Sequence, residues 1–259
     1  MASPVTWFEL NGPEPELAAK FYSELFGWRV DWVTESNYAL IDTHAGNGIN
    51  GLVVGDFTAR MGDESGQTWE GEPPSTVFYA ENPDIQRLLD RAGSLGAKTL
   101  LPVTNIPNMV TFALFADPFG NVVGLLQGDG TVKVSEGANP PVDRFLLACA
   151  DQNRARDFYG ELFGWKIDEG STPPAVDGFE HAKVDTGGTG AEGGISRSPT
   201  GEPHVMMYAR VDDLRMYLSM AEALGGTTVT PPTEVDEHVS IAAFRDPQGI
   251  TFGLYTNTP

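Results

Sequence analysis

Cysteine and positive charge are both scarce in this sequence. Its 259 residues include one cysteine, Cys149, and its 16 Lys and Arg stand against 36 Asp and Glu, which gives a formal net charge of −20. A single cysteine excludes an intrachain disulfide, and its apolar neighbours predict a buried structural thiol. Because nucleic acids and anionic membranes bind basic surfaces, the charge argues against both as partners.

Long apolar runs and a leader-like start are absent as well. No stretch approaches the ~20 residues of a membrane-spanning helix, and the start of the chain, MASPVTW, lacks the basic residues and apolar core of a signal peptide. Phosphate-binding glycine loops and a nucleophile elbow are missing too. These absences predict a cytoplasmic protein with neither a membrane nor a nucleic acid as partner. The sequence leaves open whether the chain is a monomer or a homodimer.

What the sequence does contain is an internal duplication. Residues 21–31 (FYSELFGWRVD) return as residues 158–168 (FYGELFGWKID), with eight of eleven positions identical and a shift of 137 residues. In each copy the apolar residues form one stripe of a helix, and Gly27 or Gly164 stands where a left-handed residue ends a helix. A repeat of about half the chain indicates a duplicated domain rather than a short solenoid unit.

Around this motif the pattern of strands and helices occurs four times. Alternating or apolar runs predict strands, a 3.6-residue period predicts helices, and each unit has the order βαβββ. A linker at residues 129–141, rich in glycine and proline, is predicted to separate an N-terminal domain at 1–128 from a C-terminal domain at 142–259. The expected fold class is therefore α+β, with four modules paired into two domains.

A second motif, Asp-Pro-x-Gly, precedes the last strand of each half, at residues 117–120 and 246–249. With the Phe-Tyr-x-x-Leu-Phe-Gly-Trp segment and the four modules, it makes the chain resemble the vicinal oxygen chelate superfamily, which includes glyoxalases, bleomycin-resistance proteins and extradiol dioxygenases. The resemblance covers nearly the whole chain and implies paired modules whose sheets curl into U-shaped clefts. It implies no particular reaction, because one scaffold hosts many chemistries.

In that superfamily a divalent metal is held by His or Gln early in a module and by Glu late in one. The late position corresponds here to Gly124 and Gly253, and the early one to Trp7 and Arg144. None of these is a usual metal ligand, so the sequence predicts that the metal site of the superfamily is lost in both halves and that the protein has no resident cofactor. Glycine on a strand also leaves room for a close approach. Gly124 and Gly253 are therefore candidate substrate contacts, with simple drift after loss of the metal as the alternative.

Strand parity selects further candidates, because alternate side chains face opposite sides of a sheet. Glu9 shares the cleft side of its strand with Trp7, and desolvation would suit its carboxylate to acid–base catalysis. The alternative is a solvated strand end or a pair with an arginine. Arg144 has a cleft-facing place in the second half and can bind an anionic or enolate oxygen, with a structural salt bridge as its alternative.

Two constellations add catalytic candidates. Tyr38, Asp42 and His44 are expected on one face of a strand over residues 38–44, where the carboxylate and the imidazole can share a proton. A surface histidine beside a glycine loop is the alternative. His204 and Tyr208 share a face of another strand and can act as an acid–base pair, unless His204 is an exposed strand end.

The favoured prediction is one active cleft in the first half, where Glu9, His44 and a long loop at residues 56–74 coincide. Trp69 in that loop and Trp7 are candidates for stacking on a flat ligand. The expected function is a metal-independent lyase or isomerase that dehydrates, cyclises or isomerises a hydrophobic aromatic, polyketide-like molecule. Two alternatives remain: a bleomycin-resistance-like protein that sequesters a cationic drug, which the acidic charge favours, and a glyoxalase or dioxygenase with atypical metal ligands.

Overall fold

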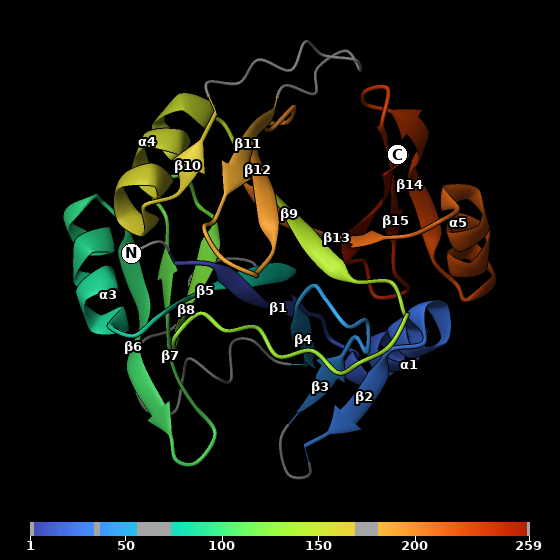
Figure 1. Cartoon of the computed structure of the whole chain (residues 1–259), viewed down its shortest axis with the longest axis horizontal. Helices are drawn as coiled ribbons and strands as arrows, with labels where there is room; N and C mark the ends of the chain where they lie inside the picture. The colour runs from blue at the N-terminus through green and yellow to red at the C-terminus, as the bar shows by residue number, and fades with distance from the viewer. Residues whose placement is uncertain (1–2, 34–36, 56–73, 169–180, 258–259) are drawn as a thin grey trace.

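The computed structural model describes residues 3–33, 37–55, 74–168 and 181–257. They form two eight-stranded sheets, and four helices occur among them (Figure 1). Each half of the chain supplies one sheet and two helices, and the elements follow one another as βαβββ in all four modules. The predicted α+β class is confirmed.

The first sheet and its helices come from the first half of the chain. Their elements are β1 (Val5–Asn11), α1 (Pro15–Phe26), β2 (Arg29–Trp32), β3 (Tyr38–Asp42), β4 (Asn50–Val54), β5 (Thr76–Asn82), α3 (Ile85–Ser94), β6 (Lys98–Ile106), β7 (Val110–Ala116) and β8 (Val122–Gln127).

The second half repeats this order. Its elements are β9 (Val142–Cys149), α4 (Gln152–Phe163), β10 (Lys166–Ile167), β11 (His181–Asp185), β12 (Glu192–Arg197), β13 (His204–Arg210), α5 (Leu214–Ala223), β14 (Thr227–Glu234), β15 (Val239–Arg245) and β16 (Thr251–Asn257). In the described part of the chain, no helix combines the length and the apolar character needed to cross a membrane.

The duplicated motif forms α1 in one half and α4 in the other. In α4 the Asp151 side chain accepts a hydrogen bond from the Arg154 backbone N–H, which satisfies a donor that the first turn of a helix leaves free. Both helices end at a left-handed glycine, Gly27 at φ 73° and Gly164 at φ 69°. The motif therefore fixes the helix end and the start of the strand behind it.

The first strands of the two modules lie side by side at the centre of each sheet. The strand order is β2-β3-β4-β1-β5-β8-β7-β6 in the first sheet and β10-β11-β12-β9-β13-β16-β15-β14 in the second. β1 runs antiparallel to β5, and β9 runs antiparallel to β13. The outermost strands of a sheet do not pair with each other, so both sheets stay open and share one topology.

The helix-covered sides of the two sheets share one hydrophobic core. α1 lies beside α5, and α3 lies beside α4, so each helix of one half packs on a helix of the other (Figure 1). The ring centroids of Phe21 and Phe244 are 5.5 Å apart, and those of Phe115 and Phe158 are 6.4 Å apart. Aromatic contacts of this kind dominate core energetics, so the halves pack as one unit with their other sheet faces turned away from the shared core.

A polar contact inside this core joins the two repeated motifs. The Tyr159 hydroxyl of the second half donates a 2.6 Å hydrogen bond to Asp117 Oδ2, in the Asp-Pro-x-Gly turn of the first half. Tyr22 and Asp246 are the reciprocal pair, and burial followed by the Asp246 charge raises the pKa of Tyr22. Since a buried polar group without a partner is costly, the Tyr159–Asp117 bond fixes the motif of the second half against the turn of the first.

The chain between β8 and β9 is held against the first half. Asn50 Nδ2 donates to the Lys133 carbonyl at 3.0 Å, and Trp28 Nε1 donates to the Pro140 carbonyl at 2.9 Å. These bonds use side chains of β4 and of the duplicated motif. The segment that connects β8 to β9 is therefore held along the first half by hydrogen bonds.

Candidate functional site

A row of paired residues crosses the face of the second sheet that points away from the shared core, called the inner face here because it lines the cavity described below. Arg144 on β9 is the Cα partner of both Glu192 on β12 and Tyr208 on β13. Tyr208 is in turn the partner of Gly253 on β16. Residues paired in this way point to the same side of a sheet and contact each other. The row joins three residues singled out from the sequence with Glu192, which was not.

The first sheet carries the corresponding row with different chemistry. Trp7 on β1 is the partner of Asn50 on β4 and of Tyr79 on β5, and Tyr79 pairs with Gly124 on β8. Trp7 thus stands where the second half has an arginine, and Asn50 stands where it has a glutamate. The tyrosine and the glycine are the same in both halves. The two copies have therefore diverged at the first two positions of the row and have kept the tyrosine and the glycine.

In both rows the tyrosine ring lies against the neighbouring glycine. A Cβ atom built on Gly124 would be 2.1 Å from Tyr79 Cδ1, and one built on Gly253 would be 2.3 Å from Tyr208 Cδ1. Non-bonded carbon atoms prefer separations of about 3.5–4.0 Å, so a side chain at either glycine requires the ring to move. The space over Gly124 and Gly253 is therefore filled by tyrosine.

The residues present do not fit the metal that the fold implies. Gly124 and Gly253 offer no side-chain donor, and the tyrosine rings occupy the space that a glutamate there would enter. Within the described ranges, no group of three or more His, Cys, Asp or Glu is placed to hold a metal ion. A zinc-type site takes three or four protein ligands. The described residues around Gly124 and Gly253 do not supply such a set.

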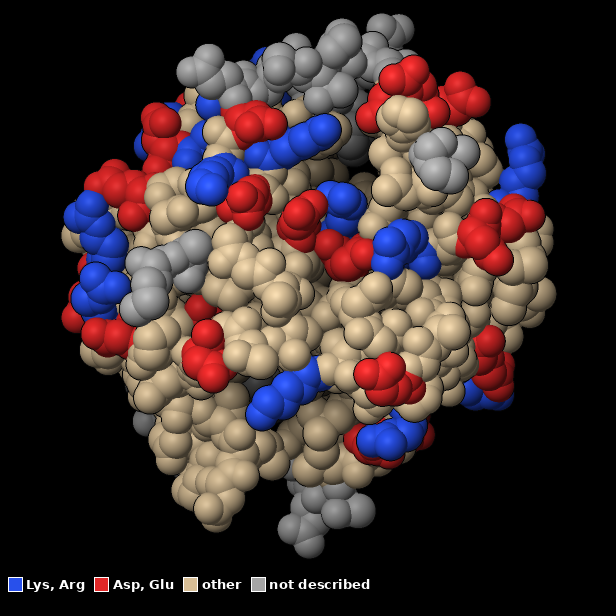
Figure 2. Space-filling view, in the orientation of Figure 1, with Lys and Arg blue, Asp and Glu red and all other residues tan. Residues whose placement is uncertain are grey.

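A cavity of about 480 Å³ opens over the row of the second half. This volume is within the range of about 300–1,000 Å³ that is typical of small-molecule sites. Its walls combine the rings of Tyr208 and Tyr255, aliphatic groups such as Leu146 and Ile241, and charged side chains from β9 to β12. In Figure 2, acidic and basic side chains mix over this part of the molecule, whereas the hairpin of β6 and β7 is largely uncharged.

Arg144 is held from two sides in this cavity. Its Nη1 donates to Glu192 Oε2 at 3.1 Å, and its guanidinium carbon lies 5.3 Å from the centroid of the Tyr255 ring. The two side chains of the ion pair are 45% and 60% exposed, so solvent screens the pair and it contributes at most about 1 kcal/mol. The tyrosine ring supports the plane of the guanidinium, and the glutamate holds one edge of it.

Further contacts anchor Tyr255. Its hydroxyl donates to Asp143 Oδ1 at 2.6 Å, and Asp143 Oδ2 lies 3.4 Å from Arg210. Burial raises the pKa of Asp143, although the hydrogen bond from Tyr255 and the charge of Arg210 act to lower it. Burial, and then the Asp143 carboxylate, raises the pKa of Tyr255. The Tyr255 hydroxyl is thus committed to Asp143, which leaves the ring face to support Arg144.

Tyr208 is a buried proton donor in the same cavity. Its side chain is 7% exposed, and burial raises the pKa of its phenol, so the hydroxyl keeps its proton at neutral pH. Within the described part of the chain, the hydroxyl makes no hydrogen bond. A hydroxyl placed in this way can donate to an oxygen atom of a ligand.

β11 adds ionisable groups to the rim. His181, Lys183 and Asp185 alternate along the strand, and all three line the cavity. Asp185 Oδ2 lies 3.9 Å from Lys166 Nζ on the neighbouring β10. The rim therefore holds groups that can accept or donate a proton beside the Arg144 row.

In the first half, Glu9 lies in a buried apolar cluster. The Tyr79 hydroxyl donates to Glu9 Oε2 at 2.6 Å, and the glutamate is 0% exposed. The apolar side chains that share this face with Tyr79 include Trp7, Val77 and Phe112. Glu9 thus has the apolar surroundings that strand parity predicts. Its tyrosine partner and its burial contradict the alternative of a solvated strand end.

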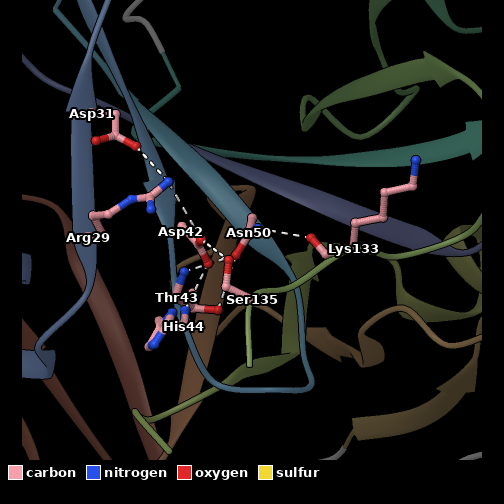
Figure 3. Close-up of polar contacts among 8 residues, drawn as sticks. All are labelled: Arg29, Asp31, Asp42, Thr43, His44, Asn50, Lys133 and Ser135. Carbon is pink, nitrogen blue, oxygen red and sulfur yellow. Dashed lines mark hydrogen bonds and ion pairs between the residues drawn. The ribbon is translucent and has the colours of Figure 1, made fainter. Parts of the chain in front are cut away.

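Tyr38 and Asp42 share a face of β3, but the expected place of His44 on that face is wrong. β3 ends at Asp42, and His44 lies beyond it, exposed, with a φ of 50°. The Asp42 carboxylate accepts hydrogen bonds from the His44 backbone N–H at 2.9 Å and from the Ser135 hydroxyl, and Arg29 lies 3.9 Å away (Figure 3). Burial acts to raise the pKa of Asp42, but the hydrogen bonds outweigh it and lower the pKa. Asp42 therefore fastens the connecting chain instead of pairing with the imidazole.

The remaining candidates lie apart from the cavity. His204 is exposed at the start of β13 and does not line the cavity, which contains Tyr208. Four residues of strand, about 13 Å, separate the two, so the expected acid–base pair cannot exchange a proton directly. The Tyr38 hydroxyl donates to Met109 Sδ at 3.2 Å. Trp69 lies outside the described residues.

Sequence reasoning missed Tyr79 and Glu192. Tyr79 carried a usable signal, because it is 129 residues before Tyr208, the same shift that relates Gly124 to Gly253. The sequence alone therefore shows that a tyrosine and a glycine recur together at equivalent positions of the two halves. Glu192 carried no such signal, because the first half has an asparagine at its place in the row.

Comparisons with known proteins agree with this architecture. The family model described as Glyoxalase/Bleomycin resistance protein/Dioxygenase superfamily matches residues 5–125 and again residues 142–254. The chain is 26% identical over 260 residues to "Putative glyoxylase CFP32" of Mycobacterium tuberculosis, a match that covers 98% of this chain and 94% of the relative. It is 24% identical over 256 residues to "Anthracycline biosynthesis protein DnrV" of Streptomyces peucetius, which covers 96% of this chain and 91% of the relative.

Among solved structures, the Mn(II)-bound glyoxalase from Novosphingobium aromaticivorans aligns with a TM-score of 0.68 at 12% identity, covering 100% of this chain and 83% of that one. The 2,3-dioxygenase LapB from Pseudomonas sp. KL28 aligns with a TM-score of 0.66 at 13% identity, covering 100% and 94%. At these identities the likeness concerns the fold alone.

Proposed function

Because the chain belongs to the glyoxalase/bleomycin resistance protein/dioxygenase superfamily, we propose that it binds a flat, hydrophobic aromatic molecule and acts on it by proton transfer, without a resident metal. The observation that carries this proposal is the cavity of the second half. There Tyr208 fills the place over Gly253, and Arg144 is its neighbour on the next strand. This moves the favoured cleft from the first half to the second.

The lining of the cavity supports this chemistry. Arg144 can stabilise the negative charge that develops on a carbonyl oxygen when a neighbouring carbon loses a proton, and Tyr208 can donate a hydrogen bond to the same oxygen. His181 or Asp185 on the rim can take that proton. If the proton returns to a different carbon, the product is an isomer. If the adjacent carbon instead loses its hydroxyl group as hydroxide, the hydroxide combines with the removed proton as water, and a carbon–carbon double bond remains in the dehydrated product.

The relatives support an aromatic ligand of polyketide type. DnrV is named an anthracycline biosynthesis protein, and its match spans 96% of this chain. We therefore place the reaction among the dehydrations, cyclisations and isomerisations of lyases and isomerases. A second candidate base is Glu9 in the first half, which the 2.6 Å hydrogen bond from Tyr79 favours.

Exchange of solvent deuterium tests the proposal. Protein treated with EDTA is incubated in D₂O with a polycyclic aromatic ketone of the anthracyclinone type, and deuterium at the carbon next to the ketone is measured by mass spectrometry. We expect protein-dependent exchange that Arg144→Gln and Tyr208→Phe each reduce by about 100-fold, the effect of losing one oxyanion donor. Glu9→Gln separates the two clefts, because it leaves exchange in the second half intact.

The alternatives give different results in the same experiment. A sequestering protein binds the ketone without exchange, and a metal enzyme loses exchange in EDTA and regains it with Mn²⁺ or another divalent metal. Exchange that depends on Glu9 and not on Arg144 would move the active cleft back to the first half. Each of these outcomes contradicts the proposal as stated.

A further inference from the structure

We propose that the second-half cavity selects an anionic aromatic ligand, whose carboxylate, phenolate or enolate oxygen displaces Glu192 from Arg144 and accepts a hydrogen bond from Tyr208. The inference rests on the proposed function, because it concerns the same cavity. It adds the charge of the ligand and the side chain that the ligand replaces.

The lining of this cavity is less acidic than the protein as a whole. Three Lys and Arg stand against four Asp and Glu among its lining residues, compared with 16 against 36 in the whole chain. Lys166 lies 3.9 Å from Asp185, so one of the acidic groups is already paired within the rim. On a protein with a net charge of −20, the cavity is a place where an anion meets comparatively little repulsion.

Glu192 occupies the place of a ligand anion. A single N–H of Arg144 donates to its Oε2 at 3.1 Å, and the glutamate side chain is 60% exposed. An exposed single contact of this kind is weak. A ligand carboxylate that takes two N–H groups of the guanidinium side by side forms a stronger contact. Glu192 therefore satisfies the arginine in the free protein and can be exchanged for a ligand.

The donors for that anion are held in place before a ligand arrives. The Tyr255 ring supports the guanidinium plane of Arg144 at 5.3 Å, and the Tyr255 hydroxyl is anchored on Asp143 at 2.6 Å. Tyr208 is the direct partner of Arg144 on the adjacent strand, and its hydroxyl has no acceptor among the described residues. Arg144 and Tyr208 thus offer N–H and O–H donors at neighbouring positions, and preorganised donors bind an anion at lower entropic cost.

The first half shows that these features are specific to the second. Trp7 stands at the arginine position and offers no charge. Asn50 stands at the glutamate position, and its amide is already committed to the Lys133 carbonyl at 3.0 Å. The same scaffold therefore exists with and without the anion-binding pair in one chain.

Titration calorimetry of the full chain with three matched probes tests the inference. The probes are 3-hydroxy-2-naphthoate, its neutral methyl ester, and the cation 2-naphthylmethylammonium. We expect the naphthoate to bind about tenfold or more tightly than the ester, as a charge-assisted contact requires. Arg144→Gln should remove this difference. Glu192→Gln should strengthen naphthoate binding several-fold and leave the ester unchanged, because it removes only a competitor for the arginine.

Glu161→Gln is the matched control, because Glu161 forms an exposed ion pair with Arg91 between α4 and α3, away from the cavity. Glu161→Gln removes one negative charge, as Glu192→Gln does, and should leave the affinities for the naphthoate and for the ester unchanged. Three outcomes would overturn the inference and leave the proposed aromatic site unaffected. They are equal binding of the naphthoate and the ester, tighter binding of the cation than of the naphthoate, and weaker binding of the naphthoate by Glu192→Gln than by the wild type. Failure of all three probes to bind, or binding that Arg144→Gln and Tyr208→Phe both leave unchanged, would overturn the proposed function as well.

Discussion

The ring of Tyr208 lies so close over Gly253 that a Cβ atom on the glycine would be 2.3 Å from Tyr208 Cδ1. Tyr79 and Gly124 repeat the arrangement in the other half, at 2.1 Å. A tyrosine on the first strand of a module and a glycine on its last strand therefore act as a fitted pair. The pair explains why the glycines recur at equivalent places, since each is needed by its tyrosine ring.

Gly253→Ala should lower the free energy of unfolding by about 1–3 kcal/mol, because the added methyl overpacks the Tyr208 ring. Denaturant unfolding measures the change. Gly93→Ala is the control, because Gly93 lies inside α3 with no atom within 4 Å of an added Cβ. It should be neutral or stabilise by up to about 1 kcal/mol. If Tyr208→Ala does not relieve the cost of Gly253→Ala in the double variant, the two residues are not a fitted pair.

The fold is readable from the sequence because its signals are local and occur twice. Helix periodicity, the glycines after α1 and α4, and the 137-residue repeat need no knowledge of the third dimension. The site is less readable. Parity places Arg144 and Tyr208 on the inner face, but their direct pairing depends on the register between β9 and β13. The sequence does not show that His44 leaves its strand at φ 50° or that Tyr255 lies under Arg144.

His44→Ala should change the free energy of unfolding by no more than about 0.5 kcal/mol, as expected for an exposed side chain. Asp42→Ala should cost about 1–3 kcal/mol, because the Ser135 hydroxyl and the His44 backbone N–H lose their acceptor. Urea unfolding of both variants compares the roles. If His44→Ala lowers the free energy of unfolding more than Asp42→Ala does, the imidazole contributes to the stability of the first half and this interpretation is wrong.

Asp117 gives the stability a defined pH dependence. Burial raises the pKa of this carboxyl above its usual 3.8, although the hydrogen bond from Tyr159 acts to lower it. The native state then holds the proton where the unfolded state has released it, so the contribution of Asp117 is full below pH 3.8 and is lost as the pH rises through the native pKa. Between pH 3.8 and the native pKa of Asp117, the free energy of unfolding of the wild type should therefore fall relative to that of Asp117→Asn, as urea unfolding at a series of pH values would measure. A relative stability that rises instead would contradict the assignment.

Cys149 should be chemically inert in the native protein. Its side chain is 0% exposed, and burial raises the pKa of the thiol to about 11. Since the thiolate is the reactive form, labelling with a disulfide reagent at pH 8 should be at least about 100-fold slower in native protein than in guanidinium. Rapid stoichiometric labelling of the folded chain would show that β9 opens readily.

The most direct test of the central claim is a crystal structure of the protein grown with 3-hydroxy-2-naphthoate and MnCl₂, with anomalous data collected at the manganese edge. The account predicts ligand density in the second-half cavity, with an oxygen within hydrogen-bonding distance of Arg144 and Tyr208. It predicts no anomalous peak at the inner strands of either half. A manganese ion bound by inner-strand side chains near Gly124 or Gly253, with the tyrosine ring displaced, would contradict it.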